Sequence, residues 1–208
     1  MTIASKRSGE RKGVVRTAEI VRNTKETQIQ LKINLDGDGV SKIDTGLGFF
    51  NHMLTLLSAH SKIDLELTVH GDLDVDGHHT VEDVGIALGQ AVAKALGDKK
   101  GLRRYGFFIL PMDETLAQTA IDFSGRPYLV YNATFPVERV GNFDLELVHE
   151  FWLGFANASA CNLHVNVPYG QNGHHISEAI FKATARAMRA AVENDPRQTG
   201  VPSTKGTL

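Results

Sequence analysis

Alternating apolar and polar residues predict the strands of the first half of the chain. Residues 28–35, QIQLKINL, alternate strictly, so one face of this strand is expected to be buried and the other to face water. Residues 63–69 follow the same pattern, with isoleucine, leucine and valine directed inward. A further β-rich stretch at 16–21 is joined to residues 28–35 by the short polar turn 23–25.

Two longer stretches of the first half have the period of about 3.6 residues that marks an amphipathic helix. The first is residues 48–60. Its predicted apolar stripe consists of Phe49, Met53, Leu56 and Leu57. The second is residues 78–96, which is followed by Gly97, a residue type that commonly ends a helix.

The second half of the chain repeats this order of elements. Strands are predicted at residues 107–110, 117–123, 128–135 and 162–167, and helices at 145–160 and 174–193. The residues from Asp195 onward contain two prolines and are expected to form a loose tail. The sequence therefore predicts an α+β fold, an internally duplicated β-β-α-β-α unit in which each half-domain is a mixed sheet packed on two helices. The half-repeats span residues 1–100 and 101–208.

One short motif opens the last helix of each half. It reads GHHTVED at residues 77–83 and returns as GHHISE at 173–178, 96 residues further along the chain. On a helix, residues three or four positions apart lie on one face, so each motif presents histidine beside glutamate. His52 and His149, which lie 97 residues apart, extend the repeat. Repetition at a fixed offset argues against the simpler interpretation, two helix starts with surface histidines.

These repeated positions supply six imidazoles and two carboxylates. The candidate metal ligands are His52, His78, His79, Glu82, His149, His174, His175 and Glu178. This ligand set suits Mn, Fe or Zn rather than Ca or Mg. Two sites of three histidines and one glutamate would leave open coordination positions, as catalytic metal sites do, so we expect one compact catalytic domain. Adjacent residues of a helix project about 100° apart, so the two histidines of each pair are expected to bind different ions.

The remaining histidines and one acidic loop are weaker candidates for metal binding. His60, His70 and His164 have no glutamate at helical spacing and are expected to lie at the surface or behind the ligands. The acidic loop 72–76 could mimic a cation-binding loop, but it lacks the glycine and terminal glutamate of a calcium hand and is expected to be solvated.

Composition is that of an ordinary globular enzyme. Of the 208 residues, 42% are hydrophobic and 22% are charged, and the net charge of −2 gives no sign of a nucleic-acid or membrane partner. The single cysteine, Cys161, excludes an internal disulfide, suits the cytoplasm and is expected to be buried. The polar, basic segment 1–13 lacks the apolar core of a secretory signal and is expected to be a loose leader.

Five stretches carry a resemblance to a known family. They are GFFNHML, HHTVEDVGIALGQA, VHEFW, GHHISEAIFKA and the tail VPSTKG. Through them the chain resembles the imidazoleglycerol-phosphate dehydratases of histidine biosynthesis along nearly its whole length. We expect the monofunctional form, since no phosphatase domain precedes these motifs.

The resemblance implies a manganese-dependent hydro-lyase with two Mn²⁺ ions per active site. The sites would lie at the subunit interfaces of a 24-subunit homo-oligomer. By similarity, one ion would be bound by His52, His79, His174 and Glu178. The other would be bound by His78, Glu82, His149 and His175.

The implied reaction eliminates water from D-erythro-imidazoleglycerol phosphate and gives imidazoleacetol phosphate. The hydrogen that is removed is not next to a carbonyl, so the reaction needs Lewis acids on the imidazole nitrogens and a carboxylate to move the proton. By resemblance, Glu19 contacts the substrate and is the candidate base, with Glu82 and Glu178 as further proton carriers. The residues that match the family's phosphate-binding positions are Arg104, Arg126, Lys182, Ser203 and Lys205.

Two other classes of function compete with this interpretation. A metal-dependent hydrolase could use the same two-metal site to activate water, although the chain has no His-Glu-x-x-His order. A metal-storage or assembly protein would need the histidines but not the arginines and lysines. Turnover of imidazoleglycerol phosphate distinguishes the three.

Overall fold

The computed structural model describes residues 16–208, so the leader predicted at 1–13 lies outside the described residues. The first half contains three strands, a helix, a strand and a helix. These elements are β1 (Thr17–Asn23), β2 (Thr27–Asn34), β3 (Ser41–Asp44), α1 (Gly48–Ser61), β4 (Asp64–Gly71) and α2 (His78–Leu96). Gly97 ends α2 with a positive φ of 55°, as the sequence predicted.

The second half repeats this order and adds a short hairpin before its first helix. Its elements are β5 (Tyr105–Met112), β6 (Thr115–Asp122), β7 (Tyr128–Asn132), β8 (Arg139–Val140), β9 (Phe143–Asp144), α3 (Leu147–Ser159), β10 (Asn162–Tyr169) and α4 (Gly173–Val192). The α+β class and the internal duplication are confirmed. The strand predicted at 128–135 ends three residues early, at Asn132.

Each half forms its own four-stranded mixed sheet, and the two sheets have the same strand order. The orders are β1-β2-β4-β3 and β5-β6-β10-β7, with antiparallel neighbours except for the parallel pairs β3–β4 and β7–β10. The predicted β-β-α-β-α plan lacks β3. This edge strand is only four residues long, SKID, and contains a single apolar residue, so no apolar alternation marks it in the sequence.

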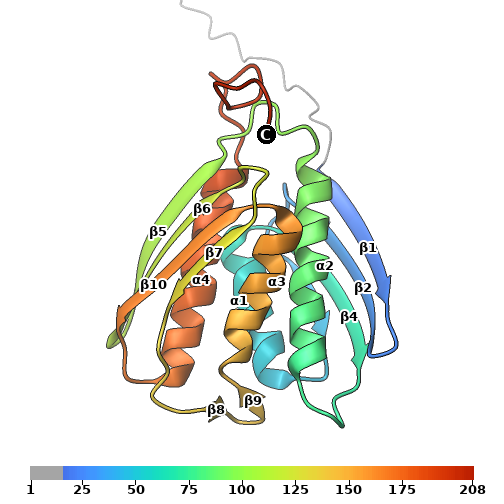
Figure 1. The fold of residues 1–208 in the computed structure, drawn as a ribbon, viewed down its shortest axis with the longest axis vertical. Helices are drawn as coiled ribbons and strands as arrows, with labels where there is room; N and C mark the ends of the chain where they lie inside the picture. Colours follow the sequence, from blue (N-terminus) through green and yellow to red (C-terminus); the bar gives the residue numbers. More distant parts are fainter. Residues whose placement is uncertain (1–15) are drawn as a thin grey trace, which may run out of the picture.

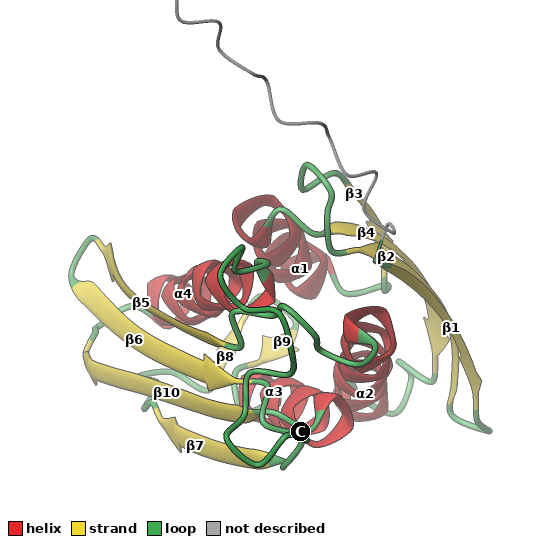
Figure 2. Cartoon of the chain, turned by 90° about the horizontal axis from the view of Figure 1, so that it is seen from above, coloured by secondary structure: helices red, strands yellow, loops and turns green. Residues whose placement is uncertain are grey.

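The four helices lie between the two sheets (Figures 1 and 2). The sheet of the first half packs on α1 and α2, and the sheet of the second half packs mainly on α4. Across the middle of the molecule, α2 packs against α3 and α1 packs against α4. Each of these two pairs contains one helix from each half, so residues of the two repeats meet between the helices. None of the helices in residues 16–208 has the length and apolar character needed to cross a membrane.

The contact between α2 and α3 depends on glycine. A Cβ added to Gly85 would lie 2.3 Å from the backbone oxygen of Phe151, and one added to Gly154 would lie 2.9 Å from that of Glu82. The two backbones therefore approach more closely than any side chain permits. This close approach fixes how the helix that carries Glu82 sits beside the helix that carries His149.

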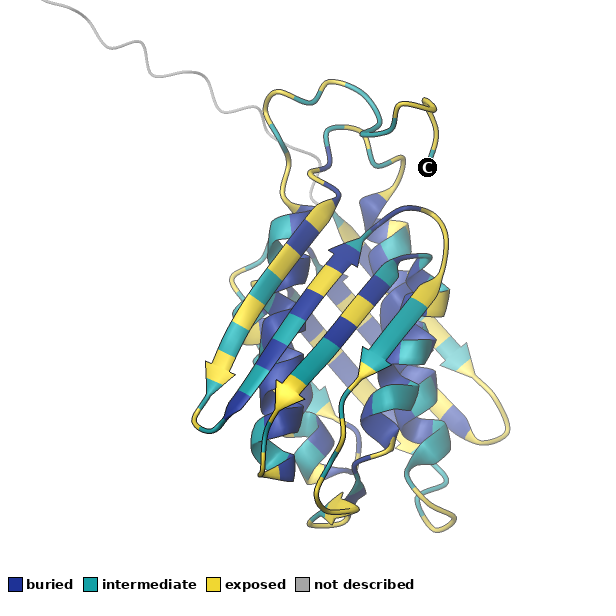
Figure 3. Ribbon diagram, turned by 60° about the vertical axis from the view of Figure 1, so that its left-hand side comes forward, coloured by how far each residue is buried: buried dark blue, intermediate teal, exposed yellow. Residues whose placement is uncertain are grey.

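Burial follows the predicted alternation in β2 and β4, whose inward residues form a continuous apolar face (Figure 3 shows the same striping on the second sheet). In α1 the buried stripe differs from the prediction. Phe50 and Leu54 are fully buried with Met53 and Leu57, whereas Phe49 and Leu56 are only partly buried. Because α1 lies between a sheet and α4, its buried face is turned by about one residue relative to the predicted stripe. Cys161 is buried, and burial raises the pKa of its thiol to about 11.

Candidate metal centre

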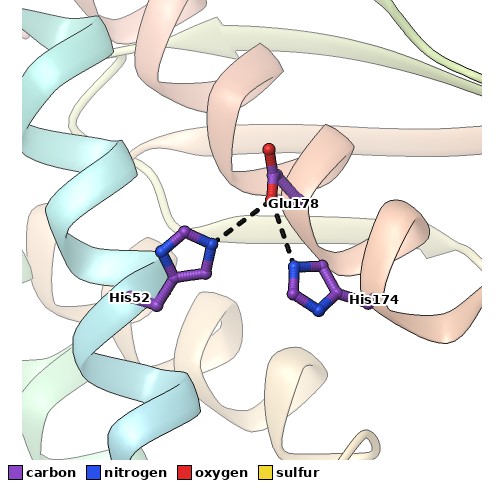
Figure 4. A group of neighbouring side chains, drawn as sticks. All are labelled: His52, His174 and Glu178. Atoms are coloured by element: carbon purple, nitrogen blue, oxygen red, sulfur yellow. Dashed lines mark hydrogen bonds and ion pairs between the residues drawn. The ribbon is translucent and has the colours of Figure 1, made fainter.

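Three candidate ligands converge between α1 and α4 (Figure 4). His52 projects from the second turn of α1, and His174 and Glu178 lie one turn apart on α4. The Nε2 atoms of His52 and His174 lie 3.3 and 3.2 Å from Oε2 of Glu178. Among residues 16–208, this is the one group of three such side chains whose ligand atoms all lie within 4.8 Å of one another.

The donor set fits a transition-metal ion. Donors about 2.1 Å from a common ion, at adjacent coordination positions, lie about 3.0–3.4 Å apart, which matches the separations of the Glu178 oxygen from the two imidazole nitrogens. Both histidines direct Nε2 at the same carboxylate oxygen. Glu178 is buried, but His52 and His174 keep about two-fifths of their side-chain surface exposed, 45% and 40%. The group can therefore accept further ligands from outside the chain.

Lys182 keeps the Glu178 carboxylate ionised. The lysine lies one turn further along α4, and its Nζ donates to Oε1 of Glu178, which leaves Oε2 to face the histidines. Burial raises the pKa of the Glu178 carboxyl, but the hydrogen bond and charge of Lys182, together with the two imidazoles, outweigh burial and lower its pKa. A carboxylate that is ionised and directed at two imidazoles is ready to bind a cation.

The equivalent group of the first motif is looser. His78 and Glu82 lie on α2, with Nε2 and Oε2 3.9 Å apart, and His149 lies on α3, the helix that packs against α2. The Nδ1 atom of His149 is hydrogen-bonded to Glu150 at 2.8 Å, and its ring packs edge-on against Tyr131. A cavity of about 830 Å³ adjoins His149 and Glu150. His149 therefore borders an open space, and within residues 16–208 it does not close on His78 and Glu82 as His52 and His174 close on Glu178.

The second histidine of each pair lies outside these groups. His79 Nδ1 is 3.0 Å from Oδ2 of Asp72, and His175 Nδ1 is 2.7 Å from Oε2 of Glu114. The hydrogen bonds to these carboxylates raise the pKa of both histidines. Within one chain, three residues of each predicted set of four ligands thus lie on one pair of packed helices. The fourth residue of each set lies elsewhere.

The predicted phosphate-binding residues do not gather around the metal group. Lys182 lies beside Glu178, but Arg104 is hydrogen-bonded through its backbone N–H to Ala191, near the far end of α4. Ala191 is 13 positions beyond Glu178 on α4. At a rise of about 1.5 Å per residue, the two lie about 20 Å apart along the helix axis. Arg104 is buried and donates to both oxygens of Asp122, at 2.6 and 3.0 Å, and to the Pro202 carbonyl.

The other candidate phosphate ligands lie at the same end as Arg104. Ser203 follows Pro202 in the C-terminal tail and caps the backbone N–H of Lys205. Arg126 lies in a tight turn in which Ser124 Oγ accepts from its backbone N–H, and Gly125 of this turn has φ of 76° and lies against Leu208. Four of the five predicted phosphate ligands therefore share one end of the molecule, and the metal group lies at the other.

Glu19 and Glu26 are both candidates for the carboxylate that moves the substrate proton. Glu19 is exposed on β1, where its nearest charged partner is Lys32 at 3.7 Å. It therefore pairs with a neighbouring strand and not with a candidate ligand. Glu26, in the turn between β1 and β2, has Oε1 3.9 Å from Nε2 of His79. No pattern along the chain points to Glu26, because only the fold brings this turn to the start of α2.

The duplicated α+β fold and its histidine–glutamate group define the class of this chain, a two-repeat protein with a candidate metal centre between helices of different repeats. Residues 45–188, which contain all eight candidate ligands, match the family model described as imidazoleglycerol-phosphate dehydratase. The chain belongs to the imidazoleglycerol-phosphate dehydratase family.

Individual relatives agree with this assignment. The chain is 57% identical over 194 residues to imidazoleglycerol-phosphate dehydratase of Albidiferax ferrireducens, covering 93% of this chain and 95% of the relative. It is 56% identical over 193 residues to the enzyme of the same name from Rhodopirellula baltica, covering 93% and 96%. The crystal structure of the Staphylococcus aureus enzyme is 42% identical, with a TM-score of 0.79 and coverage of 86% of this chain and 99% of that one. That of Pyrococcus furiosus is 33% identical, with the same TM-score and coverage of 91% and 100%.

Proposed function

We propose that the chain is a hydro-lyase that removes water from D-erythro-imidazoleglycerol phosphate to give imidazoleacetol phosphate, a step of L-histidine biosynthesis. The observation that carries this function is the convergence of His52, His174 and Glu178 within the region that matches the family. The family match favours this dehydration over the metal-dependent hydrolysis that the same ligands would also serve.

Two Mn²⁺ ions per active site complete the proposal. His52, His174 and Glu178 would hold one ion together with His79, and His78, Glu82 and His149 would hold the other together with His175. When bound, the ions supply the Lewis acidity that stabilises negative charge on the substrate's imidazole ring. The chain contributes imidazole nitrogens with open access and a carboxylate that Lys182 keeps ionised.

The active site is proposed to form between subunits of a 24-subunit particle. Two separations within one chain support a shared site. His79 and His175 are hydrogen-bonded to their own carboxylates and do not join the ligand groups of their own chain. Arg104 contacts α4 at Ala191, about 20 Å along the helix from Glu178. This separation is too large for one small phosphorylated substrate to contact both residues. Neighbouring copies would supply the missing ligands on one side and the tail residues on the other.

Removal of the carbon-bound hydrogen needs a carboxylate beside the metals that is not itself committed to binding them. Glu82 and Glu178 are assigned as ligands, which leaves them as secondary proton carriers. Glu26 lies 3.9 Å from the Nε2 atom of His79, whereas Glu19 pairs with Lys32 on an exposed strand. Because the proposed site is shared between copies, the exposed Glu19 carboxylate can serve the site of a neighbouring copy, so we assign the base and the substrate contact to Glu19, with Glu26 as the alternative base.

The phosphate group of the substrate would be bound by Lys182 of one chain and by Arg104, Arg126, Ser203 and Lys205 of another. Arg104 and Arg126 provide planar guanidinium groups suited to phosphate oxygens, and Ser203 provides a hydroxyl donor. Asp122 and Pro202 fix the Arg104 side chain in advance, which lowers the entropic cost of binding.

The decisive experiment is an assay of purified protein with imidazoleglycerol phosphate, with and without added Mn²⁺, and with detection of imidazoleacetol phosphate. Formation of the ketone product only in the presence of metal supports the proposal. Release of inorganic phosphate without the ketone would favour a hydrolase, and tight Mn²⁺ binding without either product would favour metal storage. A cytoplasmic location is proposed with this function, and a fluorescent fusion tests it.

A further inference from the structure

The inference concerns the carboxylates that hold the second histidine of each motif. His79 and His175 occupy equivalent positions of the duplicated fold. His79 is the second residue of α2, and His175 is the third residue of α4. In both, Nδ1 lies within hydrogen-bond distance of a carboxylate oxygen, at 3.0 Å from Asp72 and 2.7 Å from Glu114. An imidazole that donates its Nδ1–H to a carboxylate is fixed as the tautomer with a lone pair on Nε2, and its ring orientation is fixed as well.

The two carboxylates come from different places in the two repeats. Glu114 lies in the turn between β5 and β6, and Asp72 follows β4. The residue of the first half that matches Glu114 is Glu26, which also precedes the threonine that begins the second strand of its sheet. Glu26 does not bind Nδ1 of His79 and instead faces its Nε2. Duplication alone would have placed the same residue on Nδ1 in both halves. That two unlike residues make the same contact indicates that the site requires the contact.

Each carboxylate is committed to this contact. Asp72 is about three-quarters buried, with 24% of its side chain exposed, and its second oxygen is buried without a hydrogen-bond partner within residues 16–208. A buried carboxylate oxygen without a partner costs free energy, so a surface ion pair formed by chance does not account for Asp72. Glu114 accepts from His175 and, through its other oxygen, from the backbone N–H groups of Gln171 and Asn172. Asn172 caps α4 at His174 and His175, so this network fixes the start of the helix that carries them.

We propose that Asp72 and Glu114 are positioning residues, which hold His79 and His175 with Nε2 directed outward as metal donors for the ligand groups of neighbouring copies. This inference rests on the proposed two-metal function. Neither carboxylate touches the metal or the substrate. Their effect is on metal affinity, because the loss of a hydrogen bond behind a ligating histidine lowers metal affinity by about 10–100-fold.

The test is a titration of metal-free full-length protein with Mn²⁺, in which electron paramagnetic resonance measures the free ion. Asp72→Ala is expected to weaken Mn²⁺ binding by about 10–100-fold. Asp72→Asn is expected to recover most of the affinity, since an amide oxygen still accepts from Nδ1–H. Asp74→Ala, an exposed carboxylate of the same loop with the same change in charge, serves as the control and should bind Mn²⁺ as the unsubstituted protein does.

Glu114 is tested by the conservative variant, because Glu114→Ala could disturb the start of α4 through the lost backbone hydrogen bonds. Glu114→Gln should weaken Mn²⁺ binding, because its single amide oxygen stays with the backbone N–H groups of Gln171 and Asn172 and its NH2 group then faces Nδ1 of His175. The melting temperature of the metal-free protein should change by no more than that of the control does. If Asp72→Ala and Glu114→Gln bind Mn²⁺ as tightly as the unsubstituted protein, the inference is wrong while the proposed function stands. If the unsubstituted protein binds no Mn²⁺ in the same titration, the metal assignment itself fails, and the inference fails with it.

Discussion

His52 and Glu178 are 126 residues apart in the sequence, yet Nε2 of the first lies 3.3 Å from Oε2 of the second. They belong to different repeats and meet because α1 of the first half packs against α4 of the second. A metal held between them would join the two halves of the duplicated fold. Several consequences for activity, stability and assembly can be measured.

His52→Ala should lower the affinity for Mn²⁺ and the rate of dehydration by more than about 100-fold, because the variant removes a direct ligand rather than a residue behind one. Isothermal titration with Mn²⁺ and the turnover assay measure the two effects. His164→Ala is the matched control, since His164 lies exposed on β10. Near-normal turnover of the His52 variant would contradict the metal assignment.

Glu19→Gln should lower kcat by about 100- to 10,000-fold, the usual contribution of a positioned general base, while metal binding stays close to normal. Glu26→Gln should change kcat less, because Glu26 is only the alternative base beside His79. Steady-state kinetics on the two variants decide between the two glutamates. The opposite ranking of the two kcat values would give the role to Glu26.

Arg126→Ala should chiefly raise KM, because a phosphate contact is about equally strong in the ground state and the transition state. Loss of a charge-assisted hydrogen bond predicts an increase of about 10- to 100-fold. Arg197→Ala, which removes an arginine whose side chain is 91% exposed, is the control. A large fall in kcat at unchanged KM would show that Arg126 acts in the chemical step.

Gly85→Ala should destabilise the protein by about 2–3 kcal/mol, because its Cβ would overlap backbone of α3 that cannot move independently. The nearest atom, the Phe151 carbonyl oxygen, lies only 2.3 Å from the position of that Cβ. Gly48→Ala, at the start of α1, meets no atom within 4 Å and is expected to be neutral or stabilising by up to about 1 kcal/mol. Denaturant unfolding of both variants measures the difference, and equal stabilities would show that α2 and α3 can separate.

Removal of the metal with a chelator should convert the proposed 24-subunit particle into smaller oligomers, and Mn²⁺ should restore it. If ligands of one site come from neighbouring subunits, metal binding contributes to association. Without the metal, the imidazoles and carboxylates that the proposed interface brings together would lack a shared cation. Light scattering on metal-free and reloaded protein measures the size. An unchanged particle in demonstrably metal-free protein would mean that the interface does not depend on the metals.

The local features of this protein could be predicted from the order of its residues. The alternation of β2 and the four-residue spacing of His174 and Glu178 follow from the geometry of a strand and a helix, so they could be predicted without knowing the neighbours. The fixed offset between the two motifs likewise revealed the duplication, and the eight candidate ligands could be chosen from the repeat alone. The edge strand β3 escaped prediction because its four residues carry too little local signal.

Which of these residues come into contact depends on how the helices and sheets pack. Helix packing brings His52 to Glu178, and the β1–β2 turn brings Glu26 to His79. The same packing leaves Arg104 at the far end of α4, away from Lys182. Such contacts depend on how apolar faces from distant segments bury one another, and no spacing along the chain encodes that arrangement directly. Local periodicity therefore fixes which side chains share an element, and the packing of elements fixes which side chains share a site.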